Sequence, residues 1–289
     1  MTRGEFSWKR IAKGVNLTGF GVFLLLTTLG FLPWSFWGML IAYWPVLLIT
    51  CGIYLVFDRS RTPWLVLLSP VVFLGTMTFV ALSSPAADLG GGHRLEAARP
   101  EGATSWRLEG GLAMVEFDLI GRDLGPDLIL EGETAGSPTR PTVSVRGTDE
   151  SPRVRLRNGS FHWAWPGRGP WGRVEAGIAR DLPLTLDLDL AFVEGRIDLG
   201  EIALTRASLD GAFEDLTLRL GRPESDVRLS LKGAFNRITI EVPADVPVSV
   251  DTDGFMNSVQ GRDSDSSRTG PGYDLRLDGA FNWIEVRAE

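Results

Sequence analysis

Residues 231–240 read Leu231-Lys-Gly233-Ala-Phe235-Asn-Arg-Ile238-Thr-Ile240. Apolar residues stand at alternate positions on both sides of a Gly-Ala-Phe-Asn step. A period of two is typical of a strand with one buried face, and the small residue marks a place where the chain turns between two short strands. The same pattern returns at Leu209–Leu218 and Leu277–Val286, with a weaker copy at 252–259.

The copies follow one another at a nearly constant distance. Their glycines are Gly211, Gly233, Gly254 and Gly279, which gives a period of 21–25 residues, and earlier copies are visible at 188–192 and 108–112. A repeat of this length cannot bury its apolar face alone, so successive repeats stack as layers that share a core. We therefore predict an all-β repeat domain over residues 104–289, built either as a β-solenoid or as a sandwich of stacked sheets.

Two positions of the repeat have specific expected roles. A large apolar residue is expected to fill the interior of each layer, at Phe213, Phe235, Met256 and Phe281. Each buried Phe would contribute roughly 1.5–3 kcal/mol. The next position predicts a stacked ladder of side-chain amides, at Asn236, Asn257 and Asn282. Metal binding is the alternative, but neutral amides are poor as the sole ligands of a cation.

The N-terminal part of the chain is of a different kind. Three runs contain no charged residue: 15–32, 38–57 and 64–82. A helix needs roughly 20 apolar residues to cross a bilayer. Three such runs in succession leave no polar face for the surface of a soluble domain. We predict a membrane anchor of three transmembrane helices.

The charges in the short loops predict the orientation of the anchor in the membrane. Four basic residues lie within residues 1–14, and Arg59 and Arg61 separate the second and third runs. Basic loops stay in the cytoplasm, so the N-terminus is predicted to be cytoplasmic and the β domain extracytoplasmic, in a multi-pass protein of the cell membrane. Residues 83–103 are rich in Ala, Gly, Ser and Pro and are expected to form a flexible linker.

Composition disfavours several classes of partner. The chain has 36 acidic and 29 basic residues, and most of the acidic excess falls after Leu82. An acidic domain is repelled by phosphate backbones, so we expect no nucleic-acid partner. It also lacks the basic surface that adheres to anionic lipid. The single cysteine, Cys51, excludes an internal disulfide.

No constellation of residues predicts catalysis. The two histidines, His93 and His162, are far apart and do not have the spacing of metal ligands. There is no nucleophile elbow and no phosphate-binding glycine loop. We therefore predict no catalytic, cofactor-binding or metal-binding residues, no cofactor, and a protein that is not an enzyme.

One segment departs from the repeat. Residues 157–173 hold three tryptophans and three arginines. The candidate contact surface is formed by Trp163, Trp165, Arg168, Trp171 and Arg173. Aromatic and arginine side chains are enriched where proteins bind one another, and they also suit a membrane interface or a sugar ring. The alternative is a long loop whose tryptophans fold back on the domain.

Two regions resemble a known family. Residues 29–57, with the Trp44-Pro45 step and the Gly52-Ile-Tyr-Leu55 ending, look like the LiaI/LiaF-type transmembrane region. The alternation at Leu184–Leu204 and Gly211–Pro223 is similar to the toast-rack β-domains attached to such anchors. Leu231–Val250 is similar to the C-terminal portion of LiaF-like proteins. Some relatives have four predicted spans, whereas this sequence shows three.

The resemblance implies a role in the bacterial envelope-stress response. Relatives of this type modulate a sensor histidine kinase in the membrane and carry no catalytic residues. The leading hypothesis is therefore a non-enzymatic modulator or sensor accessory that acts by protein–protein contact, with the lipid bilayer and a membrane histidine kinase or another envelope-stress protein as partners. The alternatives are a module that binds envelope glycan or lipid headgroups and a structural scaffold, which would include a homo-oligomer assembled through strand edges.

Overall fold

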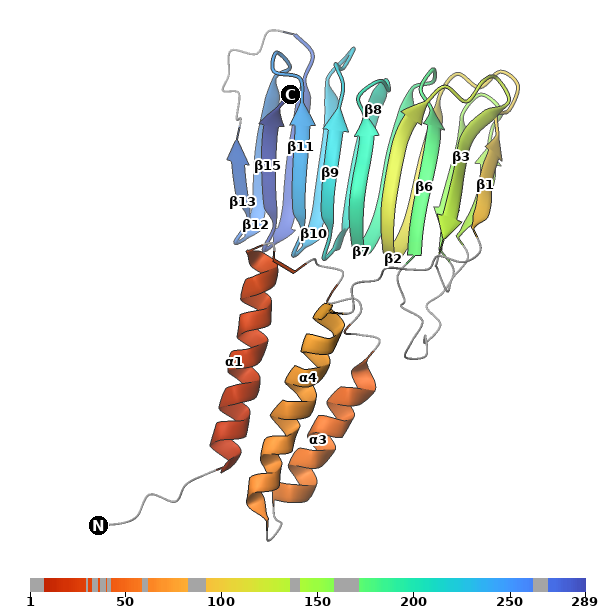
Figure 1. Cartoon of the computed structure of the whole chain (residues 1–289). Coiled ribbons are helices and arrows are strands. Elements are labelled where there is room, and N and C mark those ends of the chain that lie inside the picture. The colour runs from red at the N-terminus through yellow and green to blue at the C-terminus, as the bar shows by residue number, and fades with distance from the viewer. Residues whose placement is uncertain are drawn as a thin grey trace. The chain divides into compact units, whose positions relative to one another are not determined.

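The structure is a computed structural model that describes residues 8–29, 31–32, 36, 40, 43–58, 62–82, 92–135, 141–158, 172–261 and 270–289. The chain divides into two compact units. One is built mainly on the N-terminal helices, and the other contains the β-strands (Figure 1). The described residues thus confirm a helical N-terminal region followed by an all-β domain.

The helical unit contains α1 (Trp8–Thr28), α3 (Trp44–Asp58), the 3-10 helix η1 (Pro63–Leu67) and α4 (Leu68–Leu82). Among the described residues, one continuous helical segment is long and apolar enough to cross a membrane, the 19 residues Trp64–Leu82. A shorter apolar stretch covers Pro45–Phe57. The third predicted span, 64–82, therefore coincides with a helical segment of sufficient length. The other two agree less closely, because α1 begins before the first predicted run and α3 begins after the start of the second.

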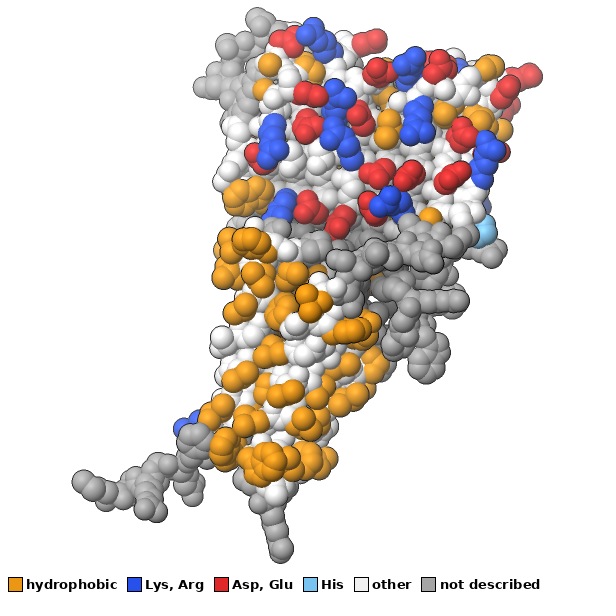
Figure 2. Space-filling view, viewed as in Figure 1, with side chains coloured by type: hydrophobic (Ala, Val, Ile, Leu, Met, Phe, Trp, Pro, Cys, Tyr) orange, Lys and Arg blue, Asp and Glu red, His pale blue; other side chains and the backbone are white. Residues whose placement is uncertain are grey.

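The helices pack through a small apolar cluster. Phe36, Met77 and Val80 are buried together, and the ring of Phe23 stacks on Phe36 with a centroid distance of 5.5 Å. The outward surface of this unit is mostly apolar (Figure 2). A surface of this kind is unfavourable in water and suits contact with lipid.

The β unit is built from layers, and each C-terminal repeat makes one layer of two strands that meet at a corner. The two-strand layers are β8 (Leu204–Ala212) with β9 (Asp215–Leu220), β10 (Val227–Ala234) with β11 (Arg237–Val242), β12 (Val248–Phe255) with β13 (Ser258–Gly261), and β14 (Tyr273–Ala280) with β15 (Trp283–Ala288). Two longer strands, β2 (Trp106–Arg122) and β7 (Leu184–Leu199), run through the same corner without a break.

Neighbouring layers pair in parallel and in the register of the repeat. Leu209 lies beside Leu231, and Leu231 beside Leu277. The order in space is β7, β8, β10, β14, β12. The last layer in the sequence, β14–β15, is therefore inserted between β10–β11 and β12–β13. This leaves β12–β13 as the outermost layer at that end of the stack.

The other end of the stack is formed by the remaining strands, with antiparallel pairs at its edges. These strands are β1 (His93–Ala98), β3 (Leu128–Ala135), β4 (Thr142–Gly147), β5 (Pro152–Arg157) and β6 (Gly172–Ala179). Strand β1 pairs antiparallel with β3 along its full length. The expected linker over 83–103 is therefore too long, because its second half contains β1, whose Leu95 and Ala97 are buried.

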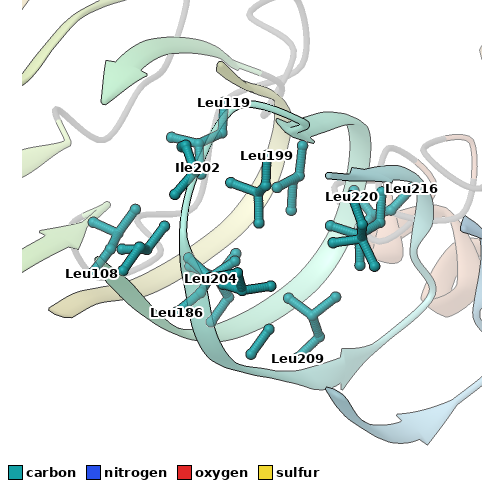
Figure 3. Close-up of a cluster of buried hydrophobic side chains, with 14 of the residues drawn as sticks. Leu108, Leu119, Leu186, Leu199, Ile202, Leu204, Leu209, Leu216 and Leu220 are labelled. Carbon is teal, nitrogen blue, oxygen red and sulfur yellow. The ribbon is translucent and has the colours of Figure 1, made fainter. Parts of the chain in front are cut away.

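The core of the β unit lies between the two walls of the layers and consists of the alternating aliphatic residues. Leu186, Leu199 and Leu209 are among the side chains that meet there (Figure 3). Full burial of each contributes roughly 1.5–3 kcal/mol. The large residues of the Gly-Ala-Phe step are not part of this core, so the expectation that they fill the interior is wrong: Phe281 is 43% exposed and Met256 is 65% exposed.

Candidate functional site

The predicted contact surface falls mostly outside the described residues. Trp163, Trp165, Arg168 and Trp171 belong to residues 159–171, which the structure does not describe. Arg173 is described and lies in β6. Its Nη2 is 2.7 Å from Oε2 of Glu116 on β2, and this hydrogen bond raises the pKa of the guanidinium. Arg173 is thus already paired within its own sheet.

The flanks of this segment show where it leaves the β unit. Arg157, at the end of β5, lies beside Gly111, and Gly172, at the start of β6, lies beside Val115. Both partners belong to β2, on either side of Met114. The segment is therefore inserted at the corner of a layer that β5 and β6 form together. Asn158, the last described residue before positions 159–171, donates from its Nδ2 to the carbonyl of Ala113 at 2.6 Å.

The same corner carries one large apolar residue in each of the next six layers. Among the described residues, the non-glycine positions with positive φ are, in stacking order, Met114, Phe192, Phe213, Phe235, Phe281 and Met256. We call this set the corner row. Their φ angles lie between 53° and 62°, in the left-handed region that non-glycine residues rarely adopt. That conformation costs roughly 1–2 kcal/mol per residue.

Stacking of the rings offsets this strain. The centroid distances are 4.8 Å for Phe192–Phe213, 5.1 Å for Phe213–Phe235 and 5.0 Å for Phe235–Phe281, with nearly parallel planes. Aromatic pairs contribute about 0.5–1.5 kcal/mol beyond the area that they bury. The positive φ directs the side chain out of the layer, so the rings stack along the corner and not in the core.

The asparagines that follow the corner row form the predicted ladder. Asn236 accepts the backbone N–H of Glu214 and donates to the carbonyl of Gly211. Asn282 accepts the N–H of Asn236 and donates to the carbonyl of Gly233. Asn257 continues the pattern at the outermost layer. Each amide therefore satisfies backbone groups of the neighbouring layer that would otherwise be buried without partners.

Glu214 occupies the ladder position in the β8–β9 layer. It is 1% exposed, and its Oε1 has no hydrogen-bond partner. Burial, and to a smaller extent the nearby charge of Asp210, raises the pKa of this carboxyl to about 8. The group is therefore largely neutral at pH 7. Among the described residues, Glu214 is enclosed by the corner and is not in the lining of the hollow described below.

A solvent-open hollow of 390 Å³ lies beside the corner, between β2, β7 and the end of β5. Its lining includes Gly111, Leu112, Asn158, Asp189 and Asp210. The described residues contain no group of three or more His, Cys, Asp or Glu side chains placed to hold a metal ion. Asp189 and Asp210 are register neighbours on β7 and β8, so the hollow carries two adjacent carboxylates, and its described lining has no nucleophile with an adjacent base.

The N-terminal part of the chain matches a known family. An apolar anchor whose last helix ends at Leu82 is followed directly by a layered β domain. Residues 13–91 match the LiaF transmembrane domain. The resemblance to the LiaI/LiaF-type transmembrane region is thus confirmed, and the match to the LiaF transmembrane domain covers all three predicted spans.

The β unit has relatives among solved structures. The chain is similar to a protein of Clostridium sporogenes ATCC 15579 described as a candidate cell adhesion protein, with a TM-score of 0.56 and 13% identity over 69% of this chain and 100% of that one. It also aligns with a candidate adhesin of Bacteroides fragilis NCTC 9343, with a TM-score of 0.29 and 7% identity over 68% of this chain and 98% of that one. The first likeness shows the fold alone, a toast-rack-like β domain. No curated protein matches the sequence.

Sequence reasoning missed two features of the β unit. The first is that the corner row faces outward. The signal for it was the Gly-Ala step before Phe213, Phe235 and Phe281, since a turn there reverses the alternation of faces. The second is Glu214, which was detectable as the one acidic residue at a position where the other copies have asparagine.

Proposed function

We propose that the protein is a non-enzymatic, membrane-anchored modulator of a bacterial envelope-stress response that acts by protein–protein contact. The observation that carries this proposal is the match of residues 13–91 to the LiaF transmembrane domain. The attached β unit supports a contact role, because it is a stack of layers that presents strand surfaces to a partner. A membrane histidine kinase is the proposed partner of the helices.

The proposed topology has three spans, with the N-terminus in the cytoplasm and the β unit outside. The apolar helical segment Trp64–Leu82 supports the third span, and basic residues at both cytoplasmic ends support the direction. Fusion of a reporter after Glu289 tests this topology. A reporter active only in the periplasm or outside the cell is expected to be active, and activity of a cytoplasmic reporter would contradict it.

Photo-crosslinking in native membranes tests the partner. Phe79 is exposed on α4, so a photoreactive phenylalanine analogue at that position should face whatever protein packs against the anchor. Met77 is fully buried on the same helix and provides the matched control. The expected result is recovery of a membrane kinase with the probe at 79 and not at 77. If probes at 79 and at other exposed positions, such as Leu55, recover no kinase or regulator, the proposal fails.

A second candidate function is the binding of envelope glycan through Trp163, Trp165 and Trp171. It is supported by the place where this segment leaves the layers, next to the aromatic corner row. Replacing all three tryptophans with Ala should abolish pull-down of the chain by purified cell wall. Binding equal to that of the unmodified chain would remove this candidate.

A further inference from the structure

Both walls of the β unit end in strands that are paired on one side only. One wall runs, in spatial order, β4, β5, β2, β7, β8, β10, β14, β12. The other runs β1, β3, β6, β2, β7, β9, β11, β15, β13, and Figure 1 shows it from β13 at one end to β1 at the other. Among the described residues, each end of the stack therefore presents two edge strands, β4 with β1 and β12 with β13. An edge strand offers unpaired backbone N–H and C=O groups to a further strand.

The hydrogen bonds of β12 to β14 show which of its backbone groups face the open end. The N–H of Tyr273 donates to the carbonyl of Pro247, and the N–H of Phe281 donates to the carbonyl of Phe255. In a parallel pair, alternate residues of a strand bond to the neighbour and the residues between them point away from it. The backbone groups of Val250 therefore point away from β14, toward the position that a further strand would occupy.

The apolar core of the β unit is incompletely covered at the same two ends. Val143 of β4 and Val250 of β12 pack against the core but are only partly buried. On the inner faces of the same two ends, Val145 of β4 is 40% exposed and Val259 of β13 is 36% exposed. If one end met the other, these side chains would join two cores into one, and the apolar surface removed from water would favour the contact.

The solvent faces of the two ends carry opposite charges. The outward positions of β4 and β5 hold three exposed arginines, Arg146, Arg153 and Arg157. The outward positions of β12 and β14 hold one exposed arginine, Arg276, and three exposed acidic residues, Asp251, Asp253 and Asp278. Opposite charges on neighbouring strands are favourable and like charges are unfavourable. Two like ends therefore repel one another, whereas unlike ends attract.

We propose that copies of this chain associate head to tail, with β4 of one copy added to β12 of the next. Strand β4 is antiparallel to the rest of its wall, so in a second copy of the same orientation it meets β12 as an antiparallel neighbour. The expected register places Arg146 opposite Asp251, because Val145 then lies beside Thr252 on the inner face. Contacts between unlike ends form an open series and not a closed dimer. The proposal is independent of any kinase partner.

Crosslinking of the full chain in mild detergent tests which ends meet. In a background with Cys51→Ala, chains that carry Ser144→Cys are mixed with chains that carry Asp253→Cys, two positions that the expected register places opposite one another. A short bis-maleimide reagent is expected to join the two variants in the mixture and to join neither variant to itself. If either variant is joined to itself as readily, like ends meet and the proposal is wrong. Absence of a product in the mixture would also overturn it.

Reversal of charge tests the predicted pair across the contact. Arg146→Glu in the first chain should lower the yield of the mixed product about five-fold, and Asp251→Arg in the second chain should restore most of it. Arg206→Glu, on the exposed face of β8 in the middle of the same wall, is the matched control and should leave the yield unchanged. A loss that Asp251→Arg does not restore would contradict the pairing of β4 with β12. Circular dichroism of the same samples identifies any variant that has lost its fold.

Discussion

The β8–β9 layer and the β14–β15 layer turn the same corner but differ in one buried side chain. In β14–β15 the position after the corner Phe is Asn282, which bonds to the layers on both sides. In β8–β9 it is Glu214, whose Oε1 is without a partner. The comparison shows that the backbone of the layer does not need the amide in order to turn, but that the stack depends on it to satisfy the groups that the turn buries.

The strongest way to disturb both layers together is to change a glycine of the β10–β11 layer that lies between them. A Cβ on Gly233, which has φ 125°, would overlap the carbonyl oxygen of Gly211. Gly233→Ala should lower the free energy of unfolding by about 3 kcal/mol, through the clash and the unfavourable φ. Urea unfolding of the full chain in mild detergent, followed by β-sheet circular dichroism, measures this. Gly111→Ala, which meets only ordinary contacts at 3.5 Å or more, should be nearly neutral.

Removing the amide from the satisfied layer should have the next largest effect. Asn282→Ala leaves the carbonyl of Gly233 and the N–H of Asn236 buried without this partner. We expect a loss of about 2 kcal/mol in the same unfolding experiment. Asn257→Ala at the outermost layer should cost less, because Asn257 is only partly buried and water can replace its bonds. A larger loss at 257 than at 282 would contradict the ladder as a buried network.

Making the two layers alike should stabilise the protein. Glu214→Asn introduces an amide at the ladder position of the β8–β9 layer. Gly211 lies beside Leu190 of β7, so by the pattern of the ladder this amide would donate to the carbonyl of Leu190. The unpartnered carboxyl is removed at the same time. We expect a gain of about 1 kcal/mol at pH 8, measured by urea unfolding. A loss of stability would show that Glu214 has a partner in solution.

The same carboxyl should make stability depend on pH. Its pKa is about 8 in the folded chain and about 4.5 when exposed, so the folded state holds the proton more tightly. Its effect on stability is most favourable below pH 4.5 and becomes less favourable as the pH rises from 4.5 to 8. Glu214→Gln should abolish this component. The measurement is the difference in unfolding free energy between the variant and the unmodified chain, which should grow with pH over that range.

The smallest expected effect on stability is at Arg173, the residue of the predicted contact surface that the structure describes. Arg173 and Glu116 form a half-exposed ion pair, and such pairs contribute about 1 kcal/mol or less. Arg173→Ala should therefore change the unfolding free energy by less than about 1 kcal/mol, and less still in high salt. A loss greater than 2 kcal/mol would mean that the pair supports the inserted segment as well as the sheet.

The sequence predicted the layers because period-two alternation and the spacing of the glycines are local signals. It did not predict the outward direction of Phe213 and Phe281, since the positive φ that turns them arises from packing of one layer on the next. It also did not predict the position of β14, because repeats of similar sequence can pair with more than one neighbour. The sequence did not predict strand β1, because only two apolar residues, Leu95 and Ala97, alternate there and the surrounding composition is that of a linker. The Trp163–Trp171 part of the contact surface stays a prediction.

The insertion of β14–β15 has a consequence for how the chain is made. During synthesis β12–β13 leaves the ribosome before the layer that separates it from β10–β11 exists. Strands β10 and β12 pair with β14 in the same register, so we expect β12 to be able to pair with β10 first, and that pairing would then have to open before residues 273–289 could enter. The native order of the layers therefore depends on residues 273–289, and a chain cut before Tyr273 is expected to leave β12 beside β10.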